Sequence, residues 1–440
     1  MKFFRNNNGN KKFIPMQGNN ISLLGQSNAY LEQEISDLDQ QILGTLAERV
    51  ALLARRPIEI EKKDLWYDHN ALKSTRPVLS CEPENSWNEI LPANQLHCTG
   101  ELARDWEMHL RRELFWGEQL LDDRVINPNF PVPYIYEQSD WGLSENRVGG
   151  SDGTAYTWSP AITEFNQVEQ LKAITVQIDP TASDRLLSLA SEVFGNILPA
   201  RRHMIWLWTQ GMTQELTLLR GMEGMMLDMV DSPQQVHRLM QFLQKAFLAK
   251  IDFLEQNRLL ILNNDGTYVG SGGFGWSHDL PQADYTDMVR TKDLWGFAES
   301  QETVGISPRM FAEFILPYQV PILERFGLNC YGCCEPLEKR WKYVREIPRL
   351  RRVSVSPFAD LRQMTDLLGD QYVLSIKPNP ADLALDEFDE AHIRGVIREI
   401  LHITRGCHVE LILKDTHTIR GDASRITRWV RIAREEIGAL

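Results

Sequence analysis

The feature of this sequence that most restricts its fold is a regular alternation of short apolar runs with longer amphipathic helical patterns, which becomes clear from about residue 165. The runs expected to form strands are Arg76–Cys81, His203–Trp208, Arg258–Asn263, Gly327–Gly332, Arg352–Ser356, Tyr372–Lys377 and His408–Leu413, with a further one near Pro131–Tyr136. Strands that alternate with helices are typical of β-α units around a parallel sheet, and about eight such units fit the chain. The sequence therefore predicts an α/β fold, a (β/α)8 TIM barrel with a helical N-terminal extension.

Three segments are expected along the chain. Residues 1–30 are rich in Asn, Gly and Gln, which favours a flexible lead-in, and residues 31–75 carry a helical pattern that stops before Pro57. The barrel is expected over residues 76–440. Within it, a stretch at about 123–160 lacks periodicity and is expected to form a lid or an insertion at the mouth of a site.

Charge and composition exclude several classes of protein. The chain has 47 Lys and Arg against 60 Asp and Glu, a net charge of −13, whereas nucleic-acid binding needs concentrated positive charge. It has no apolar run long enough for a membrane span, and its polar first residues lack the pattern of a signal peptide. Six cysteines in 440 residues are too few for a disulfide scaffold. We therefore expect a cytoplasmic protein with reduced thiols and with neither nucleic-acid nor membrane partners.

In a barrel of this kind, reactive residues lie on loops at the carboxyl ends of the strands. The residues that follow the expected strands share polar or reactive side chains: Glu82, Asn264, Asp265, His278, Asp279, Glu299, Glu302, Cys330, Cys333, Cys334, Glu335, Lys377, Asn379, Lys414, Asp415 and His417. The sequence predicts that thiols, carboxylates and an imidazole converge on one rim.

The strongest local signal is the cluster of Cys330, Cys333 and Cys334 beside Glu335. Thiolates are good zinc ligands, and ligands from separate strands form an open site with a vacant position for a substrate. The alternative is that buried cysteines are small apolar residues, and the pattern leaves both open. Because there is no second Cys-x-x-Cys pair, a closed four-thiolate structural site is excluded.

The candidate acids and bases also have two interpretations each. His417 and His278 are placed to act as ligands or as acid–base groups, but loop histidines are often capping or surface residues. Glu299 and Glu302 suit a general acid–base pair or a metal, yet they also precede the helix that starts at Ser307 and could serve as capping carboxylates.

The stretch Gly270–Gly275 has the spelling G-x-G-x-x-G, which in other proteins binds dinucleotides. The residues after it, Trp276–Pro281, do not open a helix, so no helix N-terminus is available for a pyrophosphate. A flexible glycine loop that closes over a site is the expected alternative.

Three stretches resemble the uroporphyrinogen decarboxylase-like superfamily and, within it, the corrinoid-dependent methyltransferases. They are Leu219–Gly224 with Asp231–Val236, the segment Ile306–Tyr318, and the strand-end cluster Tyr331–Cys333. The resemblance covers roughly residues 200–440 and independently implies a TIM barrel. The tetrapyrrole decarboxylase itself is not favoured, because residues 65–100 contain no counterpart of its arginine-rich motif.

The resemblance also implies a zinc site. Family methyltransferases bind zinc through a His-x-Cys at one strand end and a later Cys at another; here Tyr331 falls where the His would be, Cys333 matches the Cys, and His417 falls where the later Cys would be. The lost ligand could be replaced by a neighbouring thiol or carboxylate. The expected metal ligands are therefore Cys333, His417, Cys334 and Glu335.

What the resemblance implies for function is a demethylase-type methyltransferase that moves a methyl group between a small methylated substrate, for example a methyl ether, and the corrinoid of a separate protein. Zinc or an acid would polarise the leaving atom, and a homodimer is an expected assembly. The residues expected to be catalytic are Glu299, His278 and His417, and those expected to bind substrate are Trp276, Trp295, Tyr331 and Asn264.

Two other classes remain open, because a fold does not determine a function. One is a lyase or decarboxylase on the same barrel that uses carboxylate and imidazole acid–base chemistry without metal or corrinoid. The other is a non-catalytic binding or regulatory barrel that has lost its metal.

Overall fold

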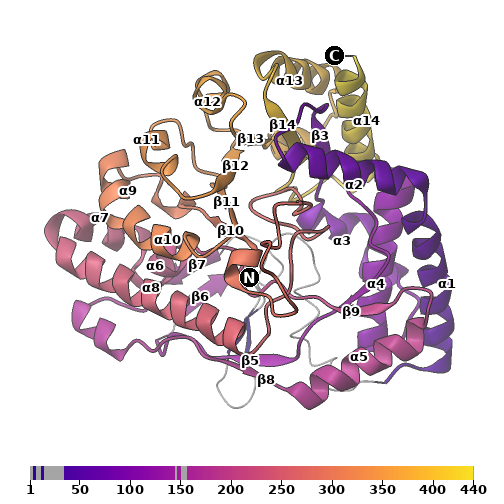
Figure 1. The fold of residues 1–440 in the computed structure, drawn as a ribbon, viewed down its shortest axis with the longest axis horizontal. Helices are drawn as coiled ribbons and strands as arrows, with labels where there is room; N and C mark the ends of the chain where they lie inside the picture. The colour runs from indigo at the N-terminus through magenta and orange to yellow at the C-terminus, as the bar shows by residue number, and fades with distance from the viewer. Residues whose placement is uncertain (1–2, 6–10, 14–33, 144–145, 150–155, 440) are drawn as a thin grey trace.

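A six-stranded parallel sheet is the framework of the computed structural model, which describes residues 3–5, 11–13, 34–143, 146–149 and 156–439. Its strands, in spatial order, are β10 (Trp295–Ala298), β11 (Leu328–Tyr331), β12 (Leu350–Val355), β13 (Val373–Ile376), β14 (His408–Leu413) and β3 (Val78–Cys81). All five neighbouring pairs are parallel. The expected α/β class is thereby confirmed, and the strand nearest the N-terminus pairs with the last strand of the chain (Figure 1).

The expected closure into an eight-stranded barrel is not confirmed, since the described residues form no continuous eight-stranded ladder. β4 (Phe130–Val132), within the expected run near Pro131, pairs in parallel with β9 (Ala200–Arg202) in a separate two-stranded sheet. β5 (Tyr136–Gln138) and β8 (Val176–Ile178) form an antiparallel pair.

The runs His203–Trp208 and Arg258–Asn263, expected as strands, contain no strand. Asn263, through its side-chain amide, and Gln210, through its side-chain oxygen and its backbone N–H, cover the free edge of β10 where a strand would have paired. The Asn263 amide accepts from the Trp295 N–H at 2.9 Å and donates to its carbonyl at 3.1 Å. Gln210 accepts through Oε1 from the Phe297 N–H and donates its own N–H to the Phe297 carbonyl, both at 2.7 Å. These amides satisfy the backbone groups at this edge, so no backbone ladder forms there.

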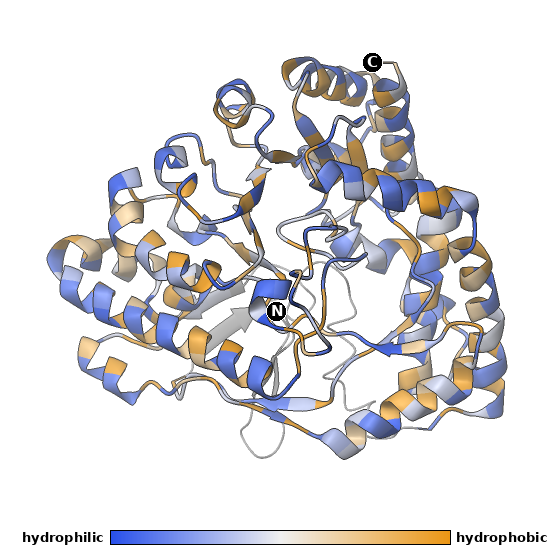
Figure 2. Cartoon of the chain, in the orientation of Figure 1, coloured by the Kyte–Doolittle hydropathy of each residue, from blue (hydrophilic) through white to orange (hydrophobic). Residues whose placement is uncertain are grey.

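Helices form the outer layer around the strands (Figure 1). They are α1 (Asp37–Ala54), α2 (Pro57–Asn70), α3 (Trp87–Ile90), α4 (Glu101–Phe115), α5 (Pro180–Phe194), α6 (Thr213–Arg220), α7 (Met222–Asp231), α8 (Pro233–Gln256), α9 (Pro308–Phe314), α10 (Leu316–Leu323), α11 (Trp341–Val344), α12 (Leu361–Leu368), α13 (Glu390–Ile403) and α14 (Ser424–Gly438). Figure 2 shows apolar and polar faces on them; α12, for example, buries Met364 and Leu368. None of the helices in the described part of the chain is long and apolar enough to cross a bilayer.

Two expected helices are divided. The pattern over residues 214–229 becomes α6 and α7, which meet at Gly221 with a φ of +81°, a conformation that favours glycine. The pattern over 308–325 becomes α9 and α10, which meet at Ile315.

The two faces of the sheet have different surroundings. Outward side chains such as Leu374 and Leu411 pack in the large core under the helices. Inward side chains such as Cys330 and Ile412 pack in smaller clusters with residues of the loop 268–280. This loop fills the inner face instead of closing over a site, which corrects the expectation for the glycine stretch. At Gly273, which has a φ of +86°, an added Cβ would lie 2.8 Å from both carboxylate oxygens of Glu410.

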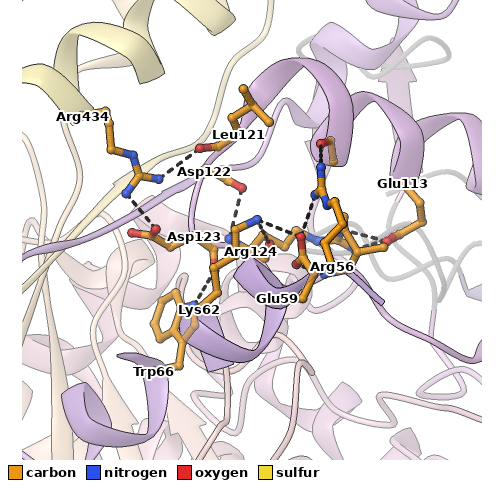
Figure 3. A network of polar contacts seen from close by, with 12 residues as sticks. Arg56, Glu59, Lys62, Trp66, Glu113, Leu121, Asp122, Asp123, Arg124 and Arg434 are labelled. Carbon is orange, nitrogen blue, oxygen red and sulfur yellow. Dashed lines mark hydrogen bonds and ion pairs between the residues drawn. The ribbon is translucent and has the colours of Figure 1, made fainter. Parts of the chain in front are cut away.

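Buried polar contacts join α2 to the segment 123–126, and Figure 3 shows some of them. Ile126 donates its N–H to Glu59 at 2.9 Å, Lys62 donates to the Arg124 carbonyl at 3.1 Å, and the Trp66 indole donates to the Asp123 carbonyl at 2.8 Å. α2, which starts at the proline where the sequence pattern stopped, therefore forms one side of the sheet's interior.

Parts of two expected segments lie outside the described residues. Of the lead-in over 1–30, the structure describes β1 (Phe3–Arg5) and β2 (Lys11–Phe13), which pair antiparallel. The segment 123–160 contains β4, β5 and the antiparallel pair β6 (Asn146–Gly149) and β7 (Tyr156–Ser159), with residues 144–145 and 150–155 not described. Its role as a lid stays a prediction.

Candidate active site

Four ionisable side chains meet at the carboxyl ends of the sheet strands. Glu299 directly follows β10, Cys333 lies just after β11, Lys377 directly follows β13 and Lys414 directly follows β14. Each is at most 5% exposed. An ionised Cys333 would shift the pKa of each of the other three. We call these four side chains the rim cluster.

Glu299 is the most perturbed acid of the rim cluster. It is fully buried, and burial together with the neighbouring carboxylates Glu302 and Glu335 raises its pKa well above the usual carboxyl value. Thr209 and Thr213 each lie within hydrogen-bond distance, at 3.4 and 3.5 Å from its two oxygens. The protonated form of this side chain is therefore favoured relative to an exposed carboxyl, and in that form it can donate a proton.

Glu302 is held apart from Glu299 by a threonine. Its carboxylate accepts from the Thr213 hydroxyl at 2.6 Å, a closer contact than the one from Thr213 to Glu299. The negative charge of the neighbouring Glu302 favours the neutral form of the fully buried Glu299.

Glu335 clamps two strand ends together. Its Oε1 accepts from the backbone N–H of Ser300 at 2.7 Å, and its Oε2 accepts from the backbone N–H of Cys333 at 2.8 Å. Both oxygens of this buried carboxyl are thus used to connect the ends of β10 and β11. Its role in the structure is to position the Cys333 loop.

The two adjacent thiols differ in environment. The sulfurs of Cys333 and Cys334 lie 3.7 Å apart, and the Ser271 hydroxyl donates to Cys333 at 3.1 Å. The contact with Cys334 and burial raise the pKa of the Cys333 thiol, whereas the same contact lowers the pKa of the half-buried Cys334. Cys334 is therefore the more acidic and more accessible thiol.

Two buried lysines complete the rim cluster. Burial lowers the pKa of Lys377 to about 8, and its ammonium donates to the Ser375 carbonyl at 2.9 Å. Burial would also lower the pKa of Lys414, but Tyr268 and Glu84 outweigh it and raise that pKa well above the usual value. Lys414 therefore supplies a fixed positive charge at the rim, with Asp415 at 3.0 Å and Glu84 at 3.7 Å.

The residues expected to hold zinc do not fit a zinc site. Within the described ranges, no group of three or more His, Cys, Asp and Glu side chains is arranged to hold a metal ion. His417 is exposed, with its Nδ1 3.0 Å from the Asn85 amide, and the Glu335 oxygens are bound to backbone N–H groups. The neighbouring thiols of Cys333 and Cys334 are the part of the expected ligand set that the structure brings together.

The expected convergence on one rim fails for four other residues. His278 is exposed and stacks on Tyr67 of α2 with ring centroids 3.9 Å apart. Trp276 contacts the same tyrosine at 5.6 Å, and Trp295 is the first residue of β10. Asn264 donates to the Leu280 carbonyl, which ties the two ends of the loop together. His278 and Trp276 lie away from the rim because their loop runs through the interior and ends beside the amino-terminal ends of the strands. Trp295 lies away from it because it is at the amino end of β10.

An ion pair supports this placement. Asp279, next to His278, lies 3.0 Å from Arg351, which is the second residue of β12 and so lies at its amino end. The rim cluster lies at the opposite, carboxyl ends.

Tyr331 faces away from the interior. Its hydroxyl donates to Gln319 of α10 at 2.8 Å, and its ring contacts Phe311 of α9 edge-on. Since side chains alternate along a strand, the inward orientation of Cys330 sends Tyr331 to the helix side. It therefore does not line the rim.

From the sequence, Lys377 and Lys414 are predicted only to lie at strand ends, and Thr209 and Thr213 are not predicted to belong to a site. The two lysines could have been found from the sequence, because each directly follows an apolar run that is expected to be buried. A lysine is rarely buried unless its charge is paired. No sequence pattern points to the two threonines. Thr209 follows the run 203–208, which contains no strand, and Thr213 is the first residue of α6. Only the tertiary structure brings them close to Glu299.

Comparisons with known proteins do not assign this site. No family model matches the chain, and no curated protein matches it. A solved structure described as a methyltransferase from Methanosarcina mazei is similar over 85% of this chain and 98% of that chain, with 12% sequence identity and a TM-score of 0.48. At this identity and score the likeness does not determine a function, so the functional interpretation depends on the side chains of the rim.

Proposed function

We propose that this chain is a methyltransferase that removes the methyl group of a small methylated substrate, for example a methyl ether, with Glu299 as general acid and a corrinoid protein as methyl acceptor. The observation that carries the proposal is the fully buried Glu299 carboxyl at the end of β10, whose pKa is raised well above the usual carboxyl value by burial and by Glu302 and Glu335. The family resemblance of the segments Leu219–Gly224 and Ile306–Tyr318 supports the choice of reaction.

The chemistry of demethylation requires such an acid. When the bond between oxygen and methyl carbon breaks, its electron pair stays on the oxygen, which is a poor leaving group unless it gains a proton. Glu299 supplies that proton and is protonated again from solvent. Thr209 and Thr213 orient its carboxyl through their hydroxyl groups.

A corrinoid carried by a separate protein would supply the nucleophile for the methyl group, while Glu299 of this chain would protonate the leaving oxygen. No step depends on zinc, because the side chains at the rim do not fit it. The positive charge of Lys414 stabilises negative charge that develops on the leaving oxygen, since a buried cation acts strongly in a low dielectric.

A second function is favoured by a specific observation, the buried cation of Lys414. A lyase or decarboxylase would use this charge to hold a substrate carboxylate and Glu299 to protonate the carbon that results. This reaction needs neither metal nor corrinoid.

The experiment that separates the two uses purified protein, a panel of small methyl ethers and methylated amines, and free cob(I)alamin as a surrogate acceptor. Formation of methylcobalamin is followed by absorbance, and carbon dioxide release is measured with carboxylated substrates in the absence of cobalamin. We expect methylcobalamin to form with wild-type protein and with Glu313→Gln, an exposed control on α9, but not with Glu299→Gln. Turnover of a substrate without cobalamin would overturn the proposal in favour of the lyase.

A further inference from the structure

A second feature lies beside Glu299, a cavity with aromatic walls between β5, α6 and α8. Its aromatic lining residues are Tyr136, Trp141, Trp206, Trp208 and Phe247. Two ionisable side chains, Glu215 of α6 and Lys250 of α8, also line it. Cavities that combine aromatic walls with a few polar groups are typical sites for small organic ligands.

The polar atoms of this cavity are incompletely paired. Among the residues that the structure describes, the buried Glu215 Oε2 and the buried Trp208 Nε1 have no hydrogen-bond partner. The Lys250 ammonium donates to the Gln138 amide oxygen at 2.7 Å and to the Trp206 carbonyl at 3.3 Å, which uses two of its three hydrogens. Buried polar groups in native proteins are nearly always paired, so these atoms indicate a missing partner.

Both ionisable groups are shifted toward their neutral forms. Burial raises the pKa of Glu215 to about 7 and lowers the pKa of Lys250 to about 8. At pH 7 Lys250 is still largely protonated and Glu215 is about half ionised, so the cavity carries less than one net positive charge.

We propose that this cavity binds a small hydroxylated aromatic molecule, a phenol. The flat ring packs against the indole and phenyl walls. The phenolic hydroxyl donates to Glu215 Oε2 and accepts from the Trp208 N–H, so one group would pair both of these atoms. A plain hydrocarbon ring would leave them unpaired, and a saturated alcohol would lose the aromatic contacts.

One residue of the cavity wall, Thr209, also contacts the rim cluster. Thr209 lies 3.4 Å from Glu299, and Trp208 contacts Phe297 of β10 at 5.1 Å between ring centroids. Thr209 would therefore lie between a ligand in the cavity and the proposed general acid. The binding of a phenol is independent of the proposed function. The inference that the phenol forms part of the substrate or product rests on the proposed function.

Isothermal titration calorimetry tests the binding, with phenol as probe and toluene and cyclohexanol as ring and hydroxyl controls. We expect one saturable phenol site per chain, with a Kd at least about 10-fold lower than for either control, since one satisfied hydrogen bond is worth about this factor. Trp208→Phe keeps the ring and removes the N–H, and Glu215→Leu removes the acceptor. Each should weaken phenol binding about 10-fold and leave toluene binding unchanged, while Glu192→Gln, exposed on α5, should change neither.

Equal binding of phenol and toluene, or phenol binding that survives both variants, would overturn the inference. A folding defect is distinguished by toluene, which should still bind to each variant. If phenol binds as expected but does not inhibit methyl transfer, the cavity stands as a phenol site and its link to the proposed function is lost. If methyl transfer is found and phenol does not bind, the proposed function stands and this inference fails.

Discussion

The two ends of the sheet's inner face use buried charge in opposite ways. Near the amino ends, Arg352 lies 3.1 Å from Glu410, His69 of α2 lies 3.4 Å from the same carboxylate, and Arg352 also donates to Asn70 at 2.7 Å. Opposite charges are paired there, and burial of Glu410 is outweighed by the charge of Arg352, so its pKa falls to about 2. At the carboxyl ends, carboxyl groups gather instead, and the pKa of Glu299 rises.

This difference separates stability from reactivity. In the first network the Arg352–Glu410 pair is ionised, and burial lowers the pKa of His69, which favours its neutral form. A crowded set of carboxyl groups instead favours a protonated acid, which can give up its proton. The account therefore assigns Glu410 to folding and Glu299 to catalysis, and variants at the two positions should behave differently.

The largest expected effect on stability is at Glu410. Glu410→Gln leaves Arg352 buried without its counter-charge, and loss of one partner of a buried pair costs about 3–5 kcal/mol in the free energy of unfolding. Denaturant unfolding at pH 7 measures this change. The matched control is Glu435→Gln, which removes a half-exposed carboxyl of α14 that pairs with Arg394 of α13. This variant should lower the free energy of unfolding by less than about 1 kcal/mol.

The stabilisation by Glu410 should depend on pH with a defined sign. Its pKa is lowered in the folded protein, so its contribution is present above the unfolded carboxyl pKa of about 4.5 and is lost as the pH falls toward 2. The stability difference between wild type and Glu410→Gln should therefore shrink over this interval. An unchanged difference from pH 7 to pH 3 would contradict the assignment of Glu410 to a structural ion pair.

Glu299→Gln should have the opposite pattern. We expect methyl transfer to fall by about 10²-fold or more, the usual contribution of a general acid. The same variant should raise Tm at pH 7, because a carboxyl with a raised pKa stabilises the fold below its unfolded pKa and loses that contribution as the pH rises. Activity assays and thermal unfolding of one preparation check both; a variant that is both less active and less stable would mean that Glu299 is structural.

A smaller effect distinguishes the thiols. Cys334 should react with iodoacetamide about 10-fold faster than Cys407 at pH 7, because the first has a lowered pKa and the second has its pKa raised by burial, while both are half-buried. Mass spectrometry of the labelled peptides gives the rates. Cys333→Ala should remove most of the difference, since the neighbouring thiol causes it.

The smallest expected effect is that of metal removal. Because no described group of side chains fits a metal ion, EDTA should leave both Tm and methyl transfer unchanged, and elemental analysis should find less than one zinc per chain. If the wild-type protein contains one zinc per chain and Cys333→Ala contains none, the zinc site predicted from the sequence would be supported instead.

The comparison also shows how far the sequence leads. The sheet strands β3, β11, β12, β13 and β14 coincide with apolar runs, since buried parallel strands are nearly continuous in hydrophobic residues. The reactive ends of these strands could therefore be found from the sequence. What it could not show is that the amides of Asn263 and Gln210 take the place of a strand along β10.

The sequence also could not predict the path of the loop that follows Asp265. This loop could continue along the rim or enter the interior, and nothing local distinguishes these paths. Its passage through the interior, made possible by Gly273 beside Glu410, takes His278 and Trp276 to the amino ends. Long-range packing decided the outcome for these residues.

The central claim is that Glu299 holds a proton at neutral pH. Infrared difference spectroscopy between wild type and Glu299→Gln at pH 7 tests it directly, because protonated and ionised carboxyl groups absorb at well separated frequencies. The account predicts that the variant loses a band of a protonated carboxylic acid. Loss of an ionised carboxylate band alone, with the protonated region unchanged, would contradict it.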